Sequence, residues 1–193
     1  MSTGKDAILS ASPVTGTGGI SYAPLGTTLP TDATIALEAA FKKGGYVGEE
    51  GVTRTTDASD DKIRAWGGDA VKIIRTDHSI VYTWQFLESA NADTLKLIHG
   101  AENVTITPPT ASVGGKVAIK HTKRIPPRMA YVLDMLDGAT KIREVVADGQ
   151  ITTSGDAVFV HSDVIRYEVT VEAFPDAQEV KAISYMDDPA PAV

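Results

Sequence analysis

The chain contains no cysteine, which excludes disulfide bonds and any zinc or iron–sulfur site held by thiolates. It also has no apolar run long enough to span a bilayer, and its N-terminus shows no basic start followed by an apolar run. We therefore expect no membrane partner and no secretory signal. Basic residues are in the minority, with 18 Lys and Arg against 25 Asp and Glu and a formal net charge of −7. This balance argues against a sequence-independent grip on nucleic acid, which needs clustered Lys and Arg.

Recognisable catalytic and metal-binding motifs are also scarce. The four histidines are scattered, without the paired spacing of a metal site: His78, His99, His121 and His161. His161-Ser162-Asp163 holds the three residue types of a hydrolytic triad. Adjacent residues of an extended chain point to alternate sides, however, so these three cannot line up. We predict no enzymatic activity, no cofactor and no metal.

Length and composition are those of one folded domain, because 193 residues with 42% hydrophobic and 22% charged residues can bury a core. The first 30 residues include 17 Gly, Ser, Thr or Pro and only two charges. Such a segment cannot build its own core. We predict a flexible N-terminal arm, a main domain that includes a long loop or hairpin arm, and a C-terminal tail. Their expected ranges are residues 1–24, 25–186 (with the hairpin arm at 53–76) and 187–193.

Most of the main domain alternates between apolar and polar residues with the period of two that is typical of strands. Residues 79–88 and 163–174 are the clearest examples. Their polar faces carry Ser79, Thr83 and Gln85 in the first segment and Arg166, Glu168, Thr170 and Glu172 in the second. Further strands are expected at residues 117–122, 150–153, 157–161 and 180–185.

Two short helices are predicted from their end signals. Asp32 can cap a helix that runs to Phe41, and Asn91 can cap another that stops at Gly100. Together with the strands, these helices predict a mainly β fold. We expect an antiparallel β-sandwich or partial barrel, with one or two short α-helices packed against it.

Asp137-Gly138 predicts a two-residue hairpin turn. Folding about this turn places Asp134 opposite Lys141 and Leu133 opposite Ile142. Both pairs support that register, because one joins opposite charges and the other joins apolar side chains.

The stretch from Ile63 to Ile74, IRAWGGDAVKII, predicts a second hairpin, with apolar residues on both of its faces. A three-residue loop at Gly67–Asp69 would pair Ile63 with Ile73 and Arg64 with Lys72. The preceding residues 53–62 are polar. A polar lead-in followed by a two-sided apolar tip is typical of an arm that reaches another surface. A hairpin folded back over its own domain is the alternative, and the pattern alone does not decide between them.

Six segments, taken in their order and spacing, carry a family resemblance. They are Leu25–Thr34 (LGTTLPTDAT), Gly45–Val52 (GYVGEEGV), Ile63–Asp69 (IRAWGGD), Tyr82–Glu88 (YTWQFLE), Val160–Asp163 (VHSD) and Tyr167–Val171 (YEVTV). They resemble the major tail proteins, or tail tube proteins, of phages of actinobacteria with long, non-contractile tails. The resemblance spans residues 22 to 186. Gly48 departs from it, since serine is expected there, and the proline-rich residues 107–109 and 125–128 fit only loosely.

The resemblance implies a structural subunit of the virion. Such subunits form hexameric rings that stack into a hollow tube, and the inner sheets of adjacent subunits join into one barrel around the lumen. The tube is assembled in the cytoplasm of the host bacterium, around a tape-measure protein, between a tail-tip initiator and a tail terminator. Double-stranded DNA later passes through the lumen without specific binding.

This family resemblance assigns roles to the two patterns described above. The polar face of one or both alternating strands would line the lumen. The apolar residues of the second hairpin would be covered by a neighbouring subunit or by the next ring, with Trp66 as an anchor. The expected interface residues are Ile63, Trp66, Val71, Ile73 and Ile74.

Two other classes of protein stay open at this point. A monomeric β-sandwich binding module, such as a glycan-binding or tail-tip domain, would expose an aromatic patch without polymerising. A hydrolase is the weaker alternative, because no nucleophile–base pair or metal set stands out.

Overall fold

The computed structural model describes residues 8–15 and 18–188 of the chain. Eleven strands, one α-helix and one 3-10 helix make up this part, so the chain is mainly β. In chain order they are β1 (Ser12–Pro13), β2 (Ile20–Pro24), β3 (Lys42–Lys43), β4 (Val47–Arg64), β5 (Ala70–Phe86), α1 (Ala92–His99), η2 (Ala101–Asn103), β6 (Val104–Thr107), β7 (Lys116–Ile119), β8 (Met129–Asp137), β9 (Thr140–Ser154), β10 (Tyr167–Ala173) and β11 (Ile183–Asp187).

Nine of these strands form one antiparallel sheet in the order β3-β2-β8-β9-β10-β5-β4, with β1 beside β8 and β11 beside β9. Strand β9 is the element that both halves of the sheet share. Its first half pairs with β8 and β11, and its second half pairs with β10. The sheet therefore folds over itself into two layers and remains open, because β3 and β4 are its two ends in the described residues. The predicted antiparallel β-sandwich is confirmed.

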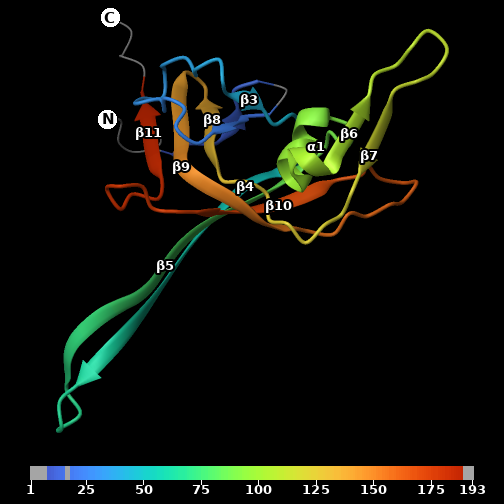
Figure 1. The fold of residues 1–193 in the computed structure, drawn as a ribbon. Coiled ribbons are helices and arrows are strands. Elements are labelled where there is room, and N and C mark those ends of the chain that lie inside the picture. Colours follow the sequence, from blue (N-terminus) through green and yellow to red (C-terminus); the bar gives the residue numbers. More distant parts are fainter. Residues whose placement is uncertain (1–7, 16–17, 189–193) are drawn as a thin grey trace, which may run out of the picture.

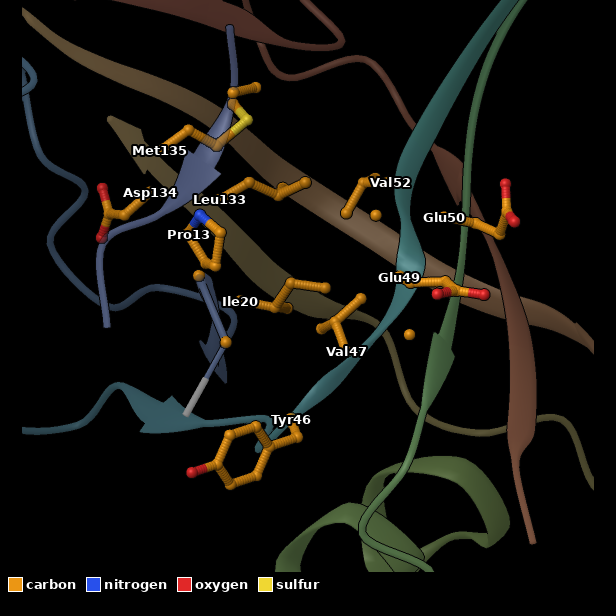
Figure 2. A pocket seen from close by; sticks show the side chains of 15 residues that line it. Pro13, Ile20, Tyr46, Val47, Glu49, Glu50, Val52, Leu133, Asp134 and Met135 are labelled. Carbon is orange, nitrogen blue, oxygen red and sulfur yellow. The ribbon is translucent and has the colours of Figure 1, made fainter. Parts of the chain in front are cut away.

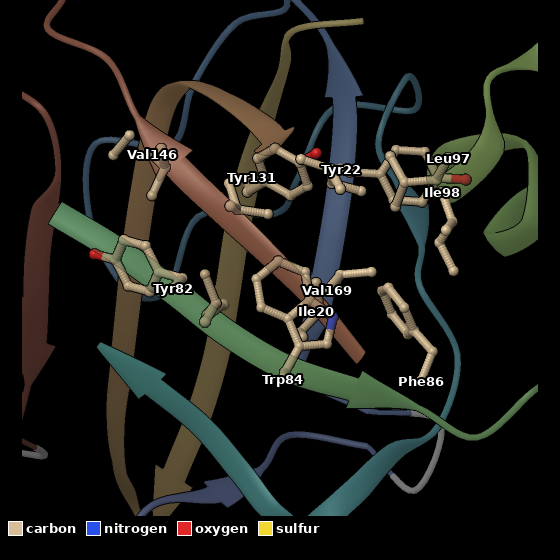
Figure 3. Packing of buried hydrophobic residues seen from close by; sticks show 14 residues of the cluster. Ile20, Tyr22, Tyr82, Trp84, Phe86, Leu97, Ile98, Tyr131, Val146 and Val169 are labelled. Atoms are coloured by element: carbon tan, nitrogen blue, oxygen red, sulfur yellow. The ribbon is translucent and has the colours of Figure 1, made fainter. Parts of the chain in front are cut away.

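The core lies between the two layers (Figure 3). Tyr82, Trp84 and Phe86 alternate along β5 and are all buried, as the period of two in this segment predicts. The Trp84 ring lies edge-to-face against Phe86, with ring centroids 5.7 Å apart, and against Tyr131 of β8 at 6.0 Å. Helix α1 adds Leu97 and Ile98 to the same cluster.

Helix α1 forms where its end signals predicted. The Asn91 Oδ1 atom accepts hydrogen bonds from the backbone N–H groups of Asp93 and Thr94, at 3.0 and 3.4 Å. These two bonds satisfy donors that have no partner within the first turn. Gly100 follows the last helical residue with a φ of 86°, a conformation that favours glycine.

The predicted helix from Asp32 to Phe41 is wrong. The Asp32 Oδ1 atom does accept hydrogen bonds from the Thr34 and Ile35 N–H groups, as a helix cap would, but no helix follows. The backbone carbonyls of Asp32 and Ile35 instead accept hydrogen bonds from the guanidinium of Arg143, at 2.9 and 2.8 Å. A distant strand thus takes the acceptors that a helix would use.

The β8–β9 hairpin forms at the predicted turn, but its register differs by two residues. Asp134 lies opposite Arg143 rather than Lys141, and Leu133 lies opposite Glu144 rather than Ile142. Arg143 Nε donates to Asp134 Oδ1 at 2.5 Å. Arg143 also donates to the carbonyls of Asp32 and Ile35, so the observed register satisfies three acceptors. The predicted register would only pair Asp134 with the exposed Lys141.

Several expected boundaries also change. Residues 20–24, assigned to a flexible N-terminal arm (residues 1–24), form β2, whose Ile20 is 1% exposed. Asp187, assigned to a C-terminal tail (residues 187–193), ends β11. Residues 157–161 form no strand, since they have no neighbouring strand to pair with, and Phe159 is exposed. Residues 1–7, 16–17 and 189–193 of the expected arm and tail lie outside the described residues.

Arg143 gives a stability test of this fold. Its side chain is 7% exposed and that of Asp134 is 18% exposed, so an Arg143→Ala variant leaves a largely buried carboxylate and two carbonyls unsatisfied. We expect the free energy of unfolding to fall by about 3 kcal/mol. Denaturant unfolding followed by circular dichroism measures the change. The exposed neighbour Lys141→Ala serves as control and should change it by less than about 0.5 kcal/mol. Equal effects would contradict the role given to Arg143.

Candidate assembly surfaces

A long hairpin of β4 and β5 leaves the body of the molecule and ends far from it (Figure 1). All residues from 53 to 78 are exposed, so this arm (residues 53–76) is not covered by its own domain. The alternative of a hairpin folded back over the sandwich is therefore wrong for the single chain. At about 3.3 Å per residue, the 14 steps along the chain from Val52 to Trp66 span about 45 Å.

The register at the tip of the arm differs from the predicted one. Ile63 lies opposite Lys72, and Ile73 lies opposite Lys62, instead of the two isoleucines facing each other. The reason is a tight turn in which Ala65 N donates to the Asp69 carbonyl, followed by a register shift next to Arg64. The predicted pairing of Arg64 with Lys72 does not form.

The five expected interface residues all lie on the outer part of the arm. Trp66 is fully exposed at the tip, and the other four are between 40% and 63% exposed: Ile63, Val71, Ile73 and Ile74. Ile63 and Ile73 belong to opposite faces of the ribbon, since cross-strand partners share a face and their partners are adjacent in sequence. The arm therefore offers apolar side chains on both faces. A two-stranded ribbon of this kind is at most marginally stable in water by itself.

The base of the arm is tied to the body by a polar cluster that the sequence did not reveal. Glu144 of β9 accepts hydrogen bonds from Arg54 Nη1 at 3.0 Å and from the Tyr82 hydroxyl at 2.8 Å. The Ser184 hydroxyl of β11 also donates to Glu144. Burial and the Glu144 charge raise the pKa of Tyr82, so this hydroxyl remains a donor at neutral pH. Four strands thus meet at one carboxylate.

The two polar strand faces expected at the lumen form one continuous surface. Strands β5 and β10 pair directly, so Gln85 lies opposite Glu168 and Thr83 lies opposite Thr170. Gln85 Nε2 donates to Glu168 Oε2 at 3.2 Å. The surface extends onto β4 and β9, where Thr53 lies opposite Thr83 and Thr153 lies opposite Thr170. Sequence reasoning missed these two threonines, although Thr53 and Thr55 flank Arg54 with the same period of two.

The remaining three expected lumen residues lie at the borders of this surface. Glu172 lies opposite Val81 within the β5–β10 pair, and Ser79 lies opposite Asp57 where the arm leaves the body. Arg166 precedes β10 and donates to both carboxylate oxygens of Asp163, at 2.7 and 2.8 Å. This pair neutralises the one expected lumen residue that carries positive charge.

A groove of about 430 Å³ opens beside the start of β4 (Figure 2). Its floor is apolar and includes Ile20, Val47, Val52 and Leu133. Strand β4 is bulged here, because Val47 pairs with Phe86 and Val52 with Trp84, which leaves residues 48–51 outside the ladder. Figure 2 shows the carboxylates of Glu49 and Glu50 directed away from this apolar floor.

A second, smaller pocket of about 250 Å³ is lined by His99, His121 and the basic residues Lys120, Lys123 and Arg124. The two histidine rings meet edge-to-face with centroids 5.2 Å apart. Burial, and then the neighbouring His121, lower the pKa of His99. In the described part of the chain no three His, Cys, Asp or Glu side chains gather as metal ligands, and no helix is long and apolar enough to cross a bilayer.

Comparison with protein families gives a match over the whole chain. A family model described as "Phage tail tube protein" matches residues 1–193. No curated protein matches the chain.

His99 makes folding stability depend on pH. Because its pKa in the folded chain lies below the usual value of 6.5, the unfolded chain takes up the proton more readily. Stability should therefore fall as the pH drops through 6.5, and level off below the folded pKa. We expect His99→Phe, which keeps a ring in place, to reduce the loss of melting temperature between pH 7.5 and pH 5. The exposed His161→Phe is the matched control, and an identical pH profile for both variants would rule out this role of His99.

Proposed function

The chain belongs to the phage tail tube protein family, and from this premise we propose that its copies form hexameric rings that stack into the hollow conduit of a non-contractile tail. As a member of this family the chain is a structural component of the virion tail. The proposal is supported above all by the arm, whose two apolar faces are exposed in a single copy.

The contrast between body and arm supports self-assembly. The body has a buried apolar core, although loop residues such as Ile125 and Phe159 stay exposed, whereas the arm buries none of its apolar side chains and exposes Trp66 and four aliphatic residues. Five large apolar side chains exposed within the twelve residues from Ile63 to Ile74 indicate an interaction site. A neighbouring subunit in the ring or in the next ring would cover it, and the exposed indole of Trp66 is the type of side chain that dominates binding energy at interfaces.

The polar surface on β5 and β10 supports a lumen lining. It is the face of these strands that points away from the core, and its charged members within the strands are Glu168 and Glu172. The open edge at β4 lies next to it, so a neighbouring subunit could pair there and continue the sheet around a ring. A weakly acidic, threonine-rich wall repels the phosphate backbone and lets DNA pass without adhering.

The subunit would work together with other proteins of the tail. The tube would form in the host cytoplasm around a tape-measure protein, start at a tail-tip initiator and stop at a terminator. The subunit would act without catalysis and without a cofactor.

Removal of the arm tests the assembly role. We expect a variant lacking residues 57–74 to keep a folded body but to form neither rings nor tubes, because the deleted residues lie outside the core. For Trp66→Ala we expect the concentration needed for assembly to rise about 30-fold, from a loss of about 2 kcal/mol per contact. Negative-stain microscopy and sedimentation of the purified chain measure assembly.

Trp66→Phe is the matched control and should restore most of the assembly, since it keeps an aromatic ring at the tip. Tubes of normal width and length from the deletion variant would refute the role of the arm. A chain that stays monomeric and binds a glycan or another tail-tip ligand would favour the binding module instead.

Reversal of the lumen charges tests the conduit. A double variant Glu168→Lys and Glu172→Lys should still form tubes, because both side chains lie on the polar face, but these tubes should retain double-stranded DNA. The retention should weaken steeply with salt, since it depends on phosphate contacts. Co-sedimentation of labelled DNA with tubes measures it. The isosteric pair Glu168→Gln and Glu172→Gln removes charge without adding any, and should retain much less. Equal retention by wild type and the lysine variant would place these residues outside the lumen.

A further inference from the structure

We propose that the groove beside β4 is the receptor for the arm tip of a second copy of this chain, with Trp66 seated on its apolar floor. This inference rests on the proposed function, because it assigns the surface that covers the arm. It goes further by naming both halves of the contact and the direction in which the contact repeats.

The groove has the size and lining that an indole ring needs. Its volume of about 430 Å³ falls in the range of roughly 300–1,000 Å³ that is typical of ligand clefts. Val47 and Val52 of β4 face Pro13, Ile20 and Leu133 across it (Figure 2). The polar handle of an indole, its N–H group, could find acceptors on residues 48–51, whose backbone lies outside the β4–β5 ladder.

Charge complementarity favours the arm tip as the occupant. Near the exposed Trp66 the tip carries three cations, Lys62, Arg64 and Lys72, against two carboxylates, Asp61 and Asp69. None of these five side chains forms an ion pair within the described residues, so the tip has a small excess of positive charge. The outer rim of the groove carries Glu49 and Glu50, both exposed and without an ion pair in the described residues, although Glu49 lies near enough to Arg166 to add to the rise in the pKa of that guanidinium that Asp163 causes. A tip with an excess of positive charge would therefore approach an apolar floor across an acidic rim.

The positions of the two surfaces determine what kind of assembly the contact builds. Residues 47–52 of β4 form the groove, and the same strand leads to the tip about 45 Å away. The arm is extended away from the body (Figure 1), so a copy cannot fill its own groove. A contact between two different patches of the same chain is heterologous and repeats head-to-tail, as a closed ring if the rotation between copies closes and as an open stack if it does not. Because the tip reaches about 45 Å beyond the groove along the arm, we take the open stack as the outcome. Copies would therefore stack along the axis of the arm.

A cross-linking experiment on the full-length chain tests this contact directly. The chain has no native cysteine, so in the double variant Gly67→Cys (beside the tip) and Ala11→Cys (on the groove wall) disulfides can join only these positions, either unlike or like. Each single variant controls for the like pairs, which by themselves give at most dimers. Polymer formed at high concentration and then oxidised should give a ladder of covalent multimers on non-reducing gels. The control pair Gly67→Cys and Ser12→Cys uses a neighbour that does not line the groove, and should cross-link much less.

Fluorescence and a blocking variant complete the test. In a Trp84→Phe background Trp66 is the only indole, and its quenching by acrylamide should fall several-fold on polymerisation.

The variant Ala11→Arg fills the groove from an exposed position and adds a charge that repels the cations of the tip. We therefore expect the concentration needed for assembly to rise at least about tenfold. The control Ser12→Arg should leave this concentration near the wild-type value.

The outcomes separate this inference from the proposed function. Tubes in which Trp66 stays fully quenchable, or in which Ala11→Arg assembles like Ser12→Arg, would overturn the receptor groove and leave the tube intact. The receptor groove is equally overturned if the disulfide forms within single chains at low concentration, or if residues that precede Ala11 are found to fill the groove. A wild-type chain that forms no higher assembly at any concentration would contradict the proposed function and this inference together.

Discussion

A ribbon of two strands has no interior in which side chains could be buried. This constraint determines which apolar side chains of the molecule stay exposed. Every side chain on the β4–β5 arm faces water on one side or the other, so its tryptophan, valine and isoleucines have no shelter within the chain. The body solves the same problem internally, because β9 is shared by both layers and lets one sheet cover itself. The chain thus combines a core that it closes by itself with an extension whose apolar side chains stay exposed in a single copy.

The contacts between the arm and the body determine the direction in which the arm leaves the body. Arg54 and Tyr82 belong to the strands of the arm, while Glu144 and Ser184 belong to the body, and all four meet within hydrogen-bond distance. The Glu144 carboxylate is 13% exposed and fully paired, and a satisfied polar network of this kind rigidifies the strands that it joins. The arm therefore leaves the body in a defined direction, which a repeating assembly needs if each subunit is to meet the next in the same way.

The sequence predicted those features that depend on local pattern. The alternation of Tyr82, Trp84 and Phe86 and the end signals of the helix at residues 92–99 are read over a few residues, and both are confirmed. Features that depend on distant partners were missed. Arg143 lies more than a hundred residues from the segment whose helix it prevents. No local signal shows that β5 pairs with β10, which is what joins two polar faces into one surface.

The register of the arm has a further consequence for the free subunit. Each isoleucine near the tip lies opposite a lysine or an aspartate: Ile63 opposite Lys72, Ile73 opposite Lys62 and Ile74 opposite Asp61. Charged residues interspersed in this way act as gatekeepers, since stacking of like ribbons would bring equal charges together. Aggregation of arms into fibrils is thereby disfavoured, although each arm exposes apolar side chains. Free copies would then resist fibril formation even at high concentration, without any loss of the apolar side chains at the tip.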